Sequence, residues 1–187
     1  MRYPRMRLGL VLVAGLIALQ SAVAGATPTV WSGLDFAFTK ANGADHTDPA
    51  NQDAITSQVE LTRAATQGLF NIAAESGYKA TSPAGTEWAF LQNNPGQSEQ
   101  DLVSTNWSLL NFADWTTALG GRGVLAGAIL NGPGVLHLID EDIYLDIQFT
   151  AWGLRGNGGF SYLRSVPEPG AGLLVGLAGF AALSRRR

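Results

Sequence analysis

The clearest pattern along this chain is the alternation of apolar and polar side chains over residues 142–152, DIYLDIQFTAW. One set, expected to face the core, consists of Ile143, Leu145, Ile147, Phe149 and Ala151, and the other consists of Tyr144, Asp146, Gln148, Thr150 and Trp152. A period of two residues is typical of a strand with one buried face. The glycine-rich residues 153–159 can adopt turn conformations, and residues 160–164 read as a returning strand, so we predict a hairpin.

Weaker alternation elsewhere indicates more strands. We expect them at residues 34–39, 55–62, 68–73, 86–91 and 135–139. Segments rich in turn-forming residues lie between them, at residues 41–53, 93–98 and 131–134. Many short strands with intervening turn signals favour an all-β fold, and we predict an antiparallel β-sandwich.

One segment departs from the strand pattern. Residues 109–119, LLNFADWTTAL, are followed by Gly120 and Gly121 and fit a short helix with a glycine C-cap as well as they fit a strand. The predicted sandwich therefore contains at most one short helix.

The N-terminal segment has the composition of a secretory signal peptide. Arg2, Arg5 and Arg7 precede an unbroken apolar run at residues 8–19, and small residues at the end of the segment allow cleavage after Ala24 or Ala26. The alternative is a retained membrane anchor, but the run is well short of the ~20 residues that a spanning helix needs. We therefore expect residues 1–26 to be a signal peptide removed by signal peptidase.

The C-terminal segment has three parts in a fixed order. Val166, Pro167, Glu168 and Pro169 come first, and the prolines keep this step out of regular structure. The 15 apolar or small residues at 170–184 would form a helix of about 22 Å, against a hydrocarbon core of ~30 Å, so we expect a short, weak membrane anchor. The last three residues, Arg185, Arg186 and Arg187, would stay on the cytoplasmic side.

This order of a Val-Pro-Glu-Pro motif, an apolar helix and an arginine cluster resembles the PEP-CTERM sorting signal of Gram-negative bacteria. The resemblance covers residues 166–187 and implies recognition by an exosortase, cleavage near the motif, and transfer of the body to the cell surface or extracellular matrix. The alternative is an ordinary C-terminal anchor. Residues 135–165 and 51–56 also look like an uncharacterised group of exported PEP-CTERM proteins, which implies no activity for the body.

The remaining body, residues 27–165, has 139 residues, enough for one domain with its own core. Six basic and fourteen acidic side chains give it a net charge of −8, which argues against a nucleic-acid partner. The chain contains no cysteine, so an exported body must be held together by core packing.

Candidate chemistry in the body is sparse, and no catalytic residue is predicted. Nucleophile, phosphate-binding and zinc-protease motifs are absent, and the only histidines are His46 and His137. We interpret His137 as a strand histidine bonded to a neighbour. Weak candidates for calcium ligands are Asp45, Asp48 and Asp53 in one acidic segment and Asp140 and Asp142 in another.

Two aromatic residues suggest an alternative role for the body. Tyr144 and Trp152 are expected on the strand face opposite the core, where aromatic rings could stack on sugars, although most tryptophans lie in cores. Our leading hypothesis is a non-enzymatic surface or matrix protein with a structural or adhesive body. The alternatives are a secreted carbohydrate-binding module, with exopolysaccharide as a partner, and a small polysaccharide hydrolase that uses two carboxylates.

Overall fold

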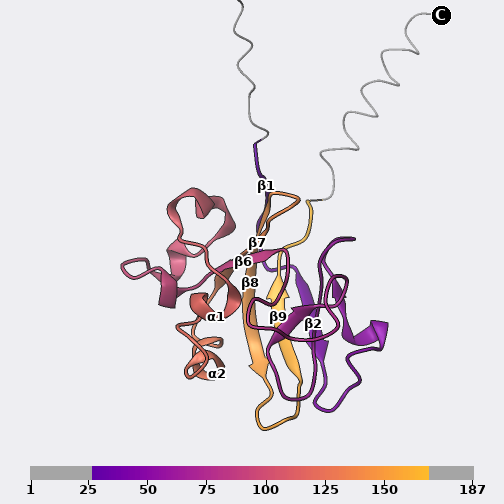
Figure 1. Cartoon of the computed structure of the whole chain (residues 1–187). Helices are drawn as coiled ribbons and strands as arrows, with labels where there is room; N and C mark the ends of the chain where they lie inside the picture. The colour runs from indigo at the N-terminus through magenta and orange to yellow at the C-terminus, as the bar shows by residue number, and fades with distance from the viewer. Residues whose placement is uncertain (1–26, 169–187) are drawn as a thin grey trace, which may run out of the picture.

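The computed structural model describes residues 27–168 and is mostly β, with two sheets and a few short helices (Figure 1). The strands are β1 (Thr29–Trp31), β2 (Phe36–Lys40), β3 (Asp53–Ala54), β4 (Glu60–Arg63), β5 (Leu69–Asn71), β6 (Thr86–Ala89), β7 (Gly134–Leu138), β8 (Ile143–Trp152) and β9 (Phe160–Arg164). The helices are α1 (Trp115–Ala118) and α2 (Leu125–Ala128), with single 3-10 turns η1 (Pro49–Asn51), η2 (Leu91–Asn93) and η3 (Glu99–Asp101) and the longer η4 (Ser104–Leu109).

The larger sheet is built around the long strand β8. Its order is β2-β9-β8-β7-β6, all antiparallel, and β1 adds to the first half of β8 in parallel. Because β9 pairs only with the second half of β8, β1 and β9 share one flank of that strand. The smaller sheet is the antiparallel set β3-β4-β5.

One core lies between the larger sheet and the elements that cover it. It joins Leu136 and Leu145 of the larger sheet with Leu61 and Leu69 of the smaller sheet, all fully buried, and with Trp115 of α1. α1 begins where the Asp114 side chain accepts hydrogen bonds from the backbone of the first helical turn, which caps it. Apolar side chains thus specify the packing and a polar cap specifies where the helix starts.

Several predicted elements are confirmed. The alternation over β8 places Ile143, Leu145, Ile147 and Phe149 with the core, and the predicted hairpin forms between β8 and β9. Strands β5, β6 and β7 lie within a residue or two of their expected positions. The coarse prediction of an antiparallel, mostly β fold is thereby confirmed, apart from the parallel β1.

Other predictions are wrong in detail. Of the strand expected at residues 55–62, only residues 60–62 are in a strand, β4, because the chain turns where Thr56 Oγ1 accepts from the backbone of Gln58 and Val59. Residues 109–119, which fitted a short helix as well as a strand, contain the short helix α1, and residue 109 is the last of η4. Neither β1 nor α2 was expected, because each is too short to show a period.

A β-bulge corrects the expected orientation of Trp152. The register of β8 against β9 shifts between Phe149 and Ala151, so the alternation changes phase there. Trp152 consequently packs against the main core, while Ala151 is exposed. Trp152 and Tyr144 therefore lie on opposite faces of the sheet, contrary to the sequence pattern.

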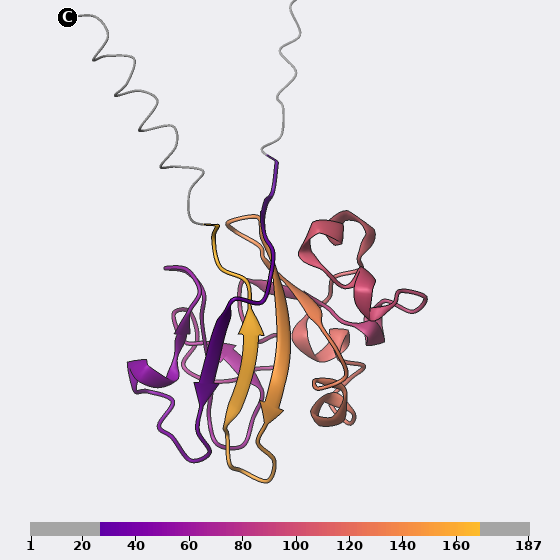
Figure 2. The same ribbon diagram turned by 180° about the vertical axis from the view of Figure 1, so that it is seen from behind.

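The described chain begins and ends at the same end of the molecule, and the β8–β9 hairpin lies at the other end (Figures 1 and 2). Within residues 27–168 no helix is long and apolar enough to cross a membrane. The predicted signal peptide, with Ala24 and Ala26, and the predicted anchor from Pro169 to the arginines at 185–187 lie outside the described residues.

Candidate functional site: an arginine-lined cavity and the exit of the C-terminal segment

A cavity of about 400 Å³, open to solvent, lies against the β8–β9 hairpin. Its lining combines three arginines with aromatic, apolar and polar neutral groups, and it contains no Asp or Glu. The lining includes Arg63, Thr66, Gln67, Tyr78, Arg122, Leu125, Trp152, Leu154 and Arg155. Half of the six cations of an otherwise acidic body therefore border one cavity.

Arg63, at the end of β4, is only 5% exposed, and its five N–H donors can be accounted for individually. Nε donates to the carbonyl of Gln67 at 2.6 Å, and Nη1 donates to the carbonyls of Gly153 at 2.9 Å and Gly159 at 3.0 Å. Within the described chain no acceptor pairs with Nη2, and this atom is not shielded from solvent. The two N–H groups of Nη2 are thus free, in a residue that borders the cavity.

The Arg63 guanidinium also lies over an aromatic ring, with Cζ 3.7 Å from the centre of the Trp152 ring. No carboxylate in residues 27–168 is close enough to form an ion pair with it. Burial lowers the pKa of Arg63 to about 10, so the group remains charged at neutral pH. The site therefore holds a positioned, buried positive charge without a counter-charge.

A second buried cation holds the same hairpin. Lys40, 2% exposed, donates from Nζ to the carbonyl of Gly158 at 3.3 Å. Desolvation, followed by repulsion from Arg63, lowers the pKa of Lys40. Lys40 and Arg63 together bind the inward-facing carbonyls of the glycine hairpin, which fixes the wall of the cavity.

Tyr144, one of the two predicted ligand-facing aromatics, is 8% exposed. Its ring stacks against His137 at 4.1 Å and against Trp107 at 4.8 Å between ring centres. Desolvation by these neighbours, followed by the charge of Asp142, raises the pKa of the phenol. Because its ring is engaged by two stacking partners, Tyr144 does not offer the sugar platform that we predicted.

Trp152, the other predicted aromatic, does border a cavity, but in a different role. Arg63 occupies a face of its ring, and the ring is only partly buried. Its function in this site is to position the guanidinium and to supply an apolar wall, rather than to present a bare stacking surface.

The five aspartates considered as weak calcium ligands have different neighbours in the structure. Asp53 lies in β3, 3% exposed, where Arg164 engages both carboxylate oxygens. Asp45 and Asp48 accept hydrogen bonds from their own loop, at Thr47 and Ala50. Asp140, at a second cavity, and Asp142, 3.3 Å from His137, complete the set. In residues 27–168 no three acidic, histidine or cysteine side chains converge as metal ligands would.

Both histidines have neighbours of the kind expected for structural residues. His137 on β7 lies between Asp142 and Glu87, with ring nitrogens 3.3 Å and 3.7 Å from their carboxylates. His46 packs edge-on against Phe70. His137 is thus a strand histidine bonded to a neighbour, as the sequence indicated.

The C-terminal end of the body is held by hydrogen bonds as far as Ser165. Ser165 is fully buried; its Oγ donates to the carbonyl of Trp31 at 2.8 Å and accepts from the backbone of Asp146 at 2.8 Å. Val166 is half-buried, and Pro167 and Glu168 are exposed. The Pro-Glu part of the predicted sorting motif therefore begins where the packed structure stops.

The sequence analysis did not single out Arg63, a buried cation that borders the cavity. Its charge was counted, but nothing in the residues around it predicted burial beside Trp152. The relevant signal was the scarcity of cations, since a body with only six of them can be searched for the ones placed within strands.

Comparison of the chain with family models, curated proteins and solved structures found no match.

Proposed function

We propose that this protein is exported and then held by its C-terminal anchor at the outer face of the inner membrane of a Gram-negative bacterium. There an exosortase cleaves near the Pro-Glu-Pro motif and sorts the body to the cell surface or matrix. In this proposal the body is a non-enzymatic β-sandwich with a structural or adhesive role, and the core shared by both sheets supports the sandwich architecture.

The observation that carries this proposal is the abrupt change in burial at the start of the motif. Ser165 is fully buried, whereas Pro167 and Glu168, two residues further on, are exposed. A processing enzyme needs an accessible, extended peptide, and cleavage beyond Ser165 leaves the hydrogen bonds to Trp31 and Asp146 intact. The body would thus lose its tail without losing a contact that holds it together.

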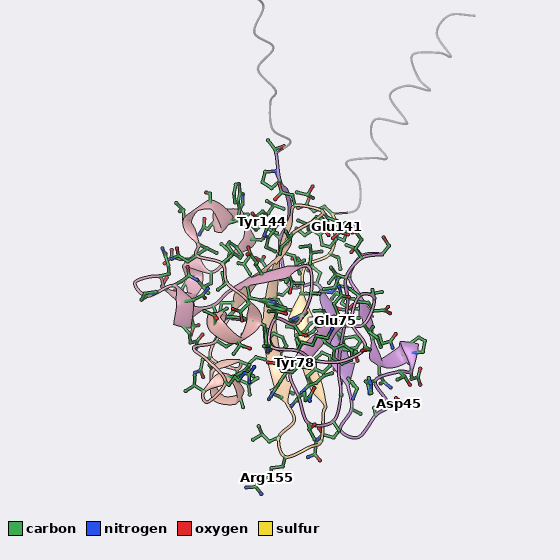
Figure 3. All side chains as sticks on the ribbon, viewed as in Figure 1. Asp45, Glu75, Tyr78, Glu141, Tyr144 and Arg155 are labelled. Carbon is green, nitrogen blue, oxygen red and sulfur yellow. The ribbon has the colours of Figure 1, made fainter. Side chains whose placement is uncertain are left out.

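The arrangement of the ends supports an adhesive role. The first and last parts of the described chain lie at one end of the described molecule, and the β8–β9 hairpin with its cavity lies at the opposite end (Figures 1 and 2). Figure 3 shows Arg155 projecting from that far end. An anchor at residue 169 and beyond would therefore present the cavity away from the membrane.

Digestion of intact host cells with an added protease tests the export part of this proposal. In the wild type we expect the body to be accessible without lysis and to lack its first 24 or 26 residues. A Leu12→Arg variant, which interrupts the apolar run of the signal peptide, should retain those residues and be digested only after lysis. Protection of the wild-type body in intact cells, equal to that of the variant, would overturn the proposal.

A further inference from the structure

The two N–H groups of Arg63 Nη2, for which the described chain offers no acceptor, indicate what the cavity binds. A guanidinium that is 95% buried normally has a carboxylate partner, as Arg164 has in Asp53. Arg63 instead has three backbone carbonyls, a tryptophan face and two free N–H groups. An anion supplied from outside would complete the arrangement that the chain leaves incomplete.

The charged residues around the cavity also favour an anionic ligand. Arg122 and Arg155 are exposed and border the opening, and no acidic residue of the described chain lines it. The two N–H groups of Arg63 Nη2 can donate charge-assisted hydrogen bonds to a carboxylate, and the fixed position of the guanidinium reduces the entropy lost on binding. The site thus combines one fixed cation with two exposed cations for capturing an anion.

The neutral lining suggests the rest of the ligand. Thr66 and Gln67 offer hydroxyl and amide groups, while Leu125, Leu154 and Trp152 provide apolar surface. Sugar rings have polar edges and apolar faces, which suit such a mixed lining. A volume of about 400 Å³ with an open side accommodates a small part of a longer chain.

We propose that this cavity binds the carboxylate-bearing sugar units of an acidic polysaccharide. The uronate carboxylate binds at Arg63 Nη2, and Arg122 and Arg155 lie at the rim of the cavity. This inference adds a ligand to the adhesive role proposed above. It rests on that role only for the place where the protein meets its ligand, the cell surface or matrix. The binding itself requires neither export nor cleavage.

Titration of the mature protein, isolated from its host with or without its tail, with oligogalacturonate tests the inference by calorimetry. We expect saturable binding that weakens as salt is added, because exposed charges take part. Arg122→Gln and Arg155→Gln should each weaken binding about fivefold. Lys79→Gln, the matched loss of an exposed charge outside the cavity, should leave it unchanged.

Competition experiments distinguish an acidic polysaccharide from a small carboxylate as the ligand. A neutral dextran oligosaccharide of the same length should not displace oligogalacturonate. If galacturonic acid or acetate displaces it at equal concentration of carboxylate, the cavity recognises a single carboxylate and the polysaccharide part of the inference is overturned.

Equal affinity for the dextran oligosaccharide, or equal effects of Arg122→Gln and Lys79→Gln, would overturn the inference entirely. Because the assay uses purified protein, its failure leaves the proposed sorting untouched, and a failure of sorting leaves the binding result valid.

Discussion

At the scale of single residues, one buried ion pair in the body has hydrogen-bond partners for both of its charged groups. Arg164 of β9 donates to Asp53 of β3 through Nε at 2.7 Å and Nη2 at 2.8 Å, and Tyr162 donates to the same carboxylate at 2.6 Å. Burial, followed by the charge of Asp53, raises the pKa of Tyr162 well above its ordinary value, which keeps the phenol a donor. This cluster joins the two sheets, a link that no local sequence pattern predicts.

Asp53→Asn tests that cluster. The substitution keeps the shape but leaves the buried Arg164 uncompensated, so we expect a loss of about 3–5 kcal/mol in the free energy of unfolding, measured by urea denaturation. Asp140→Asn, at an exposed aspartate, should change it by less than about 0.5 kcal/mol.

Adding Arg164→Met to Asp53→Asn should restore part of the loss, because the unpaired charge is then removed. A change of under about 1 kcal/mol for Asp53→Asn alone would mean that the pair does not hold the sheets together.

At the scale of elements, strong periodicity was the reliable guide. Residues 143–149 alternate because one face packs into the core, and the structure has that strand. The pattern could not show the bulge after Phe149, because a bulge depends on the pairing with β9 and leaves the sequence unchanged. The same limit hid the cavity, since Arg63 and Trp152 meet only after β4 and β8 have folded into place.

The glycine-rich turn between β8 and β9 packs closely against the chain that follows β4. Gly158 has a φ of +63°, and a Cβ there would lie 2.7 Å from the carbonyl oxygen of Ala64. Gly43 has a similar φ of +75° but no atom near its Cβ position. Comparing Gly43 with Gly158 therefore separates the free-energy cost of the left-handed backbone from the cost of the collision with Ala64.

Substitution by alanine at each glycine tests this difference. Gly43→Ala should cost about 1 kcal/mol from the left-handed backbone alone, and Gly158→Ala should cost roughly 1–3 kcal/mol more from the collision. Thermal unfolding followed by circular dichroism measures both, and equal losses would show that the hairpin does not press on Ala64.

At the scale of the whole molecule, the two ends of the body and its cavity are separated along β8. The hydrogen bond from Ser165 to the Trp31 carbonyl joins the last part of the body to the first, and Ser104 of η4 donates to the same carbonyl. In the acidic body, half of the six cations border one cavity of the described residues, which favours an anionic ligand there. The proposed processing site and the proposed binding site thus lie at opposite ends of the body.

The most direct test of the central claim is the intact mass of the mature protein from its native host, compared with a variant in which Pro167 and Pro169 are both alanine. The account predicts that the wild type has lost everything beyond the Pro-Glu-Pro motif and that the variant retains its C-terminal segment to Arg187. A segment retained in both proteins would contradict sorting by cleavage and make this an ordinary membrane-anchored domain.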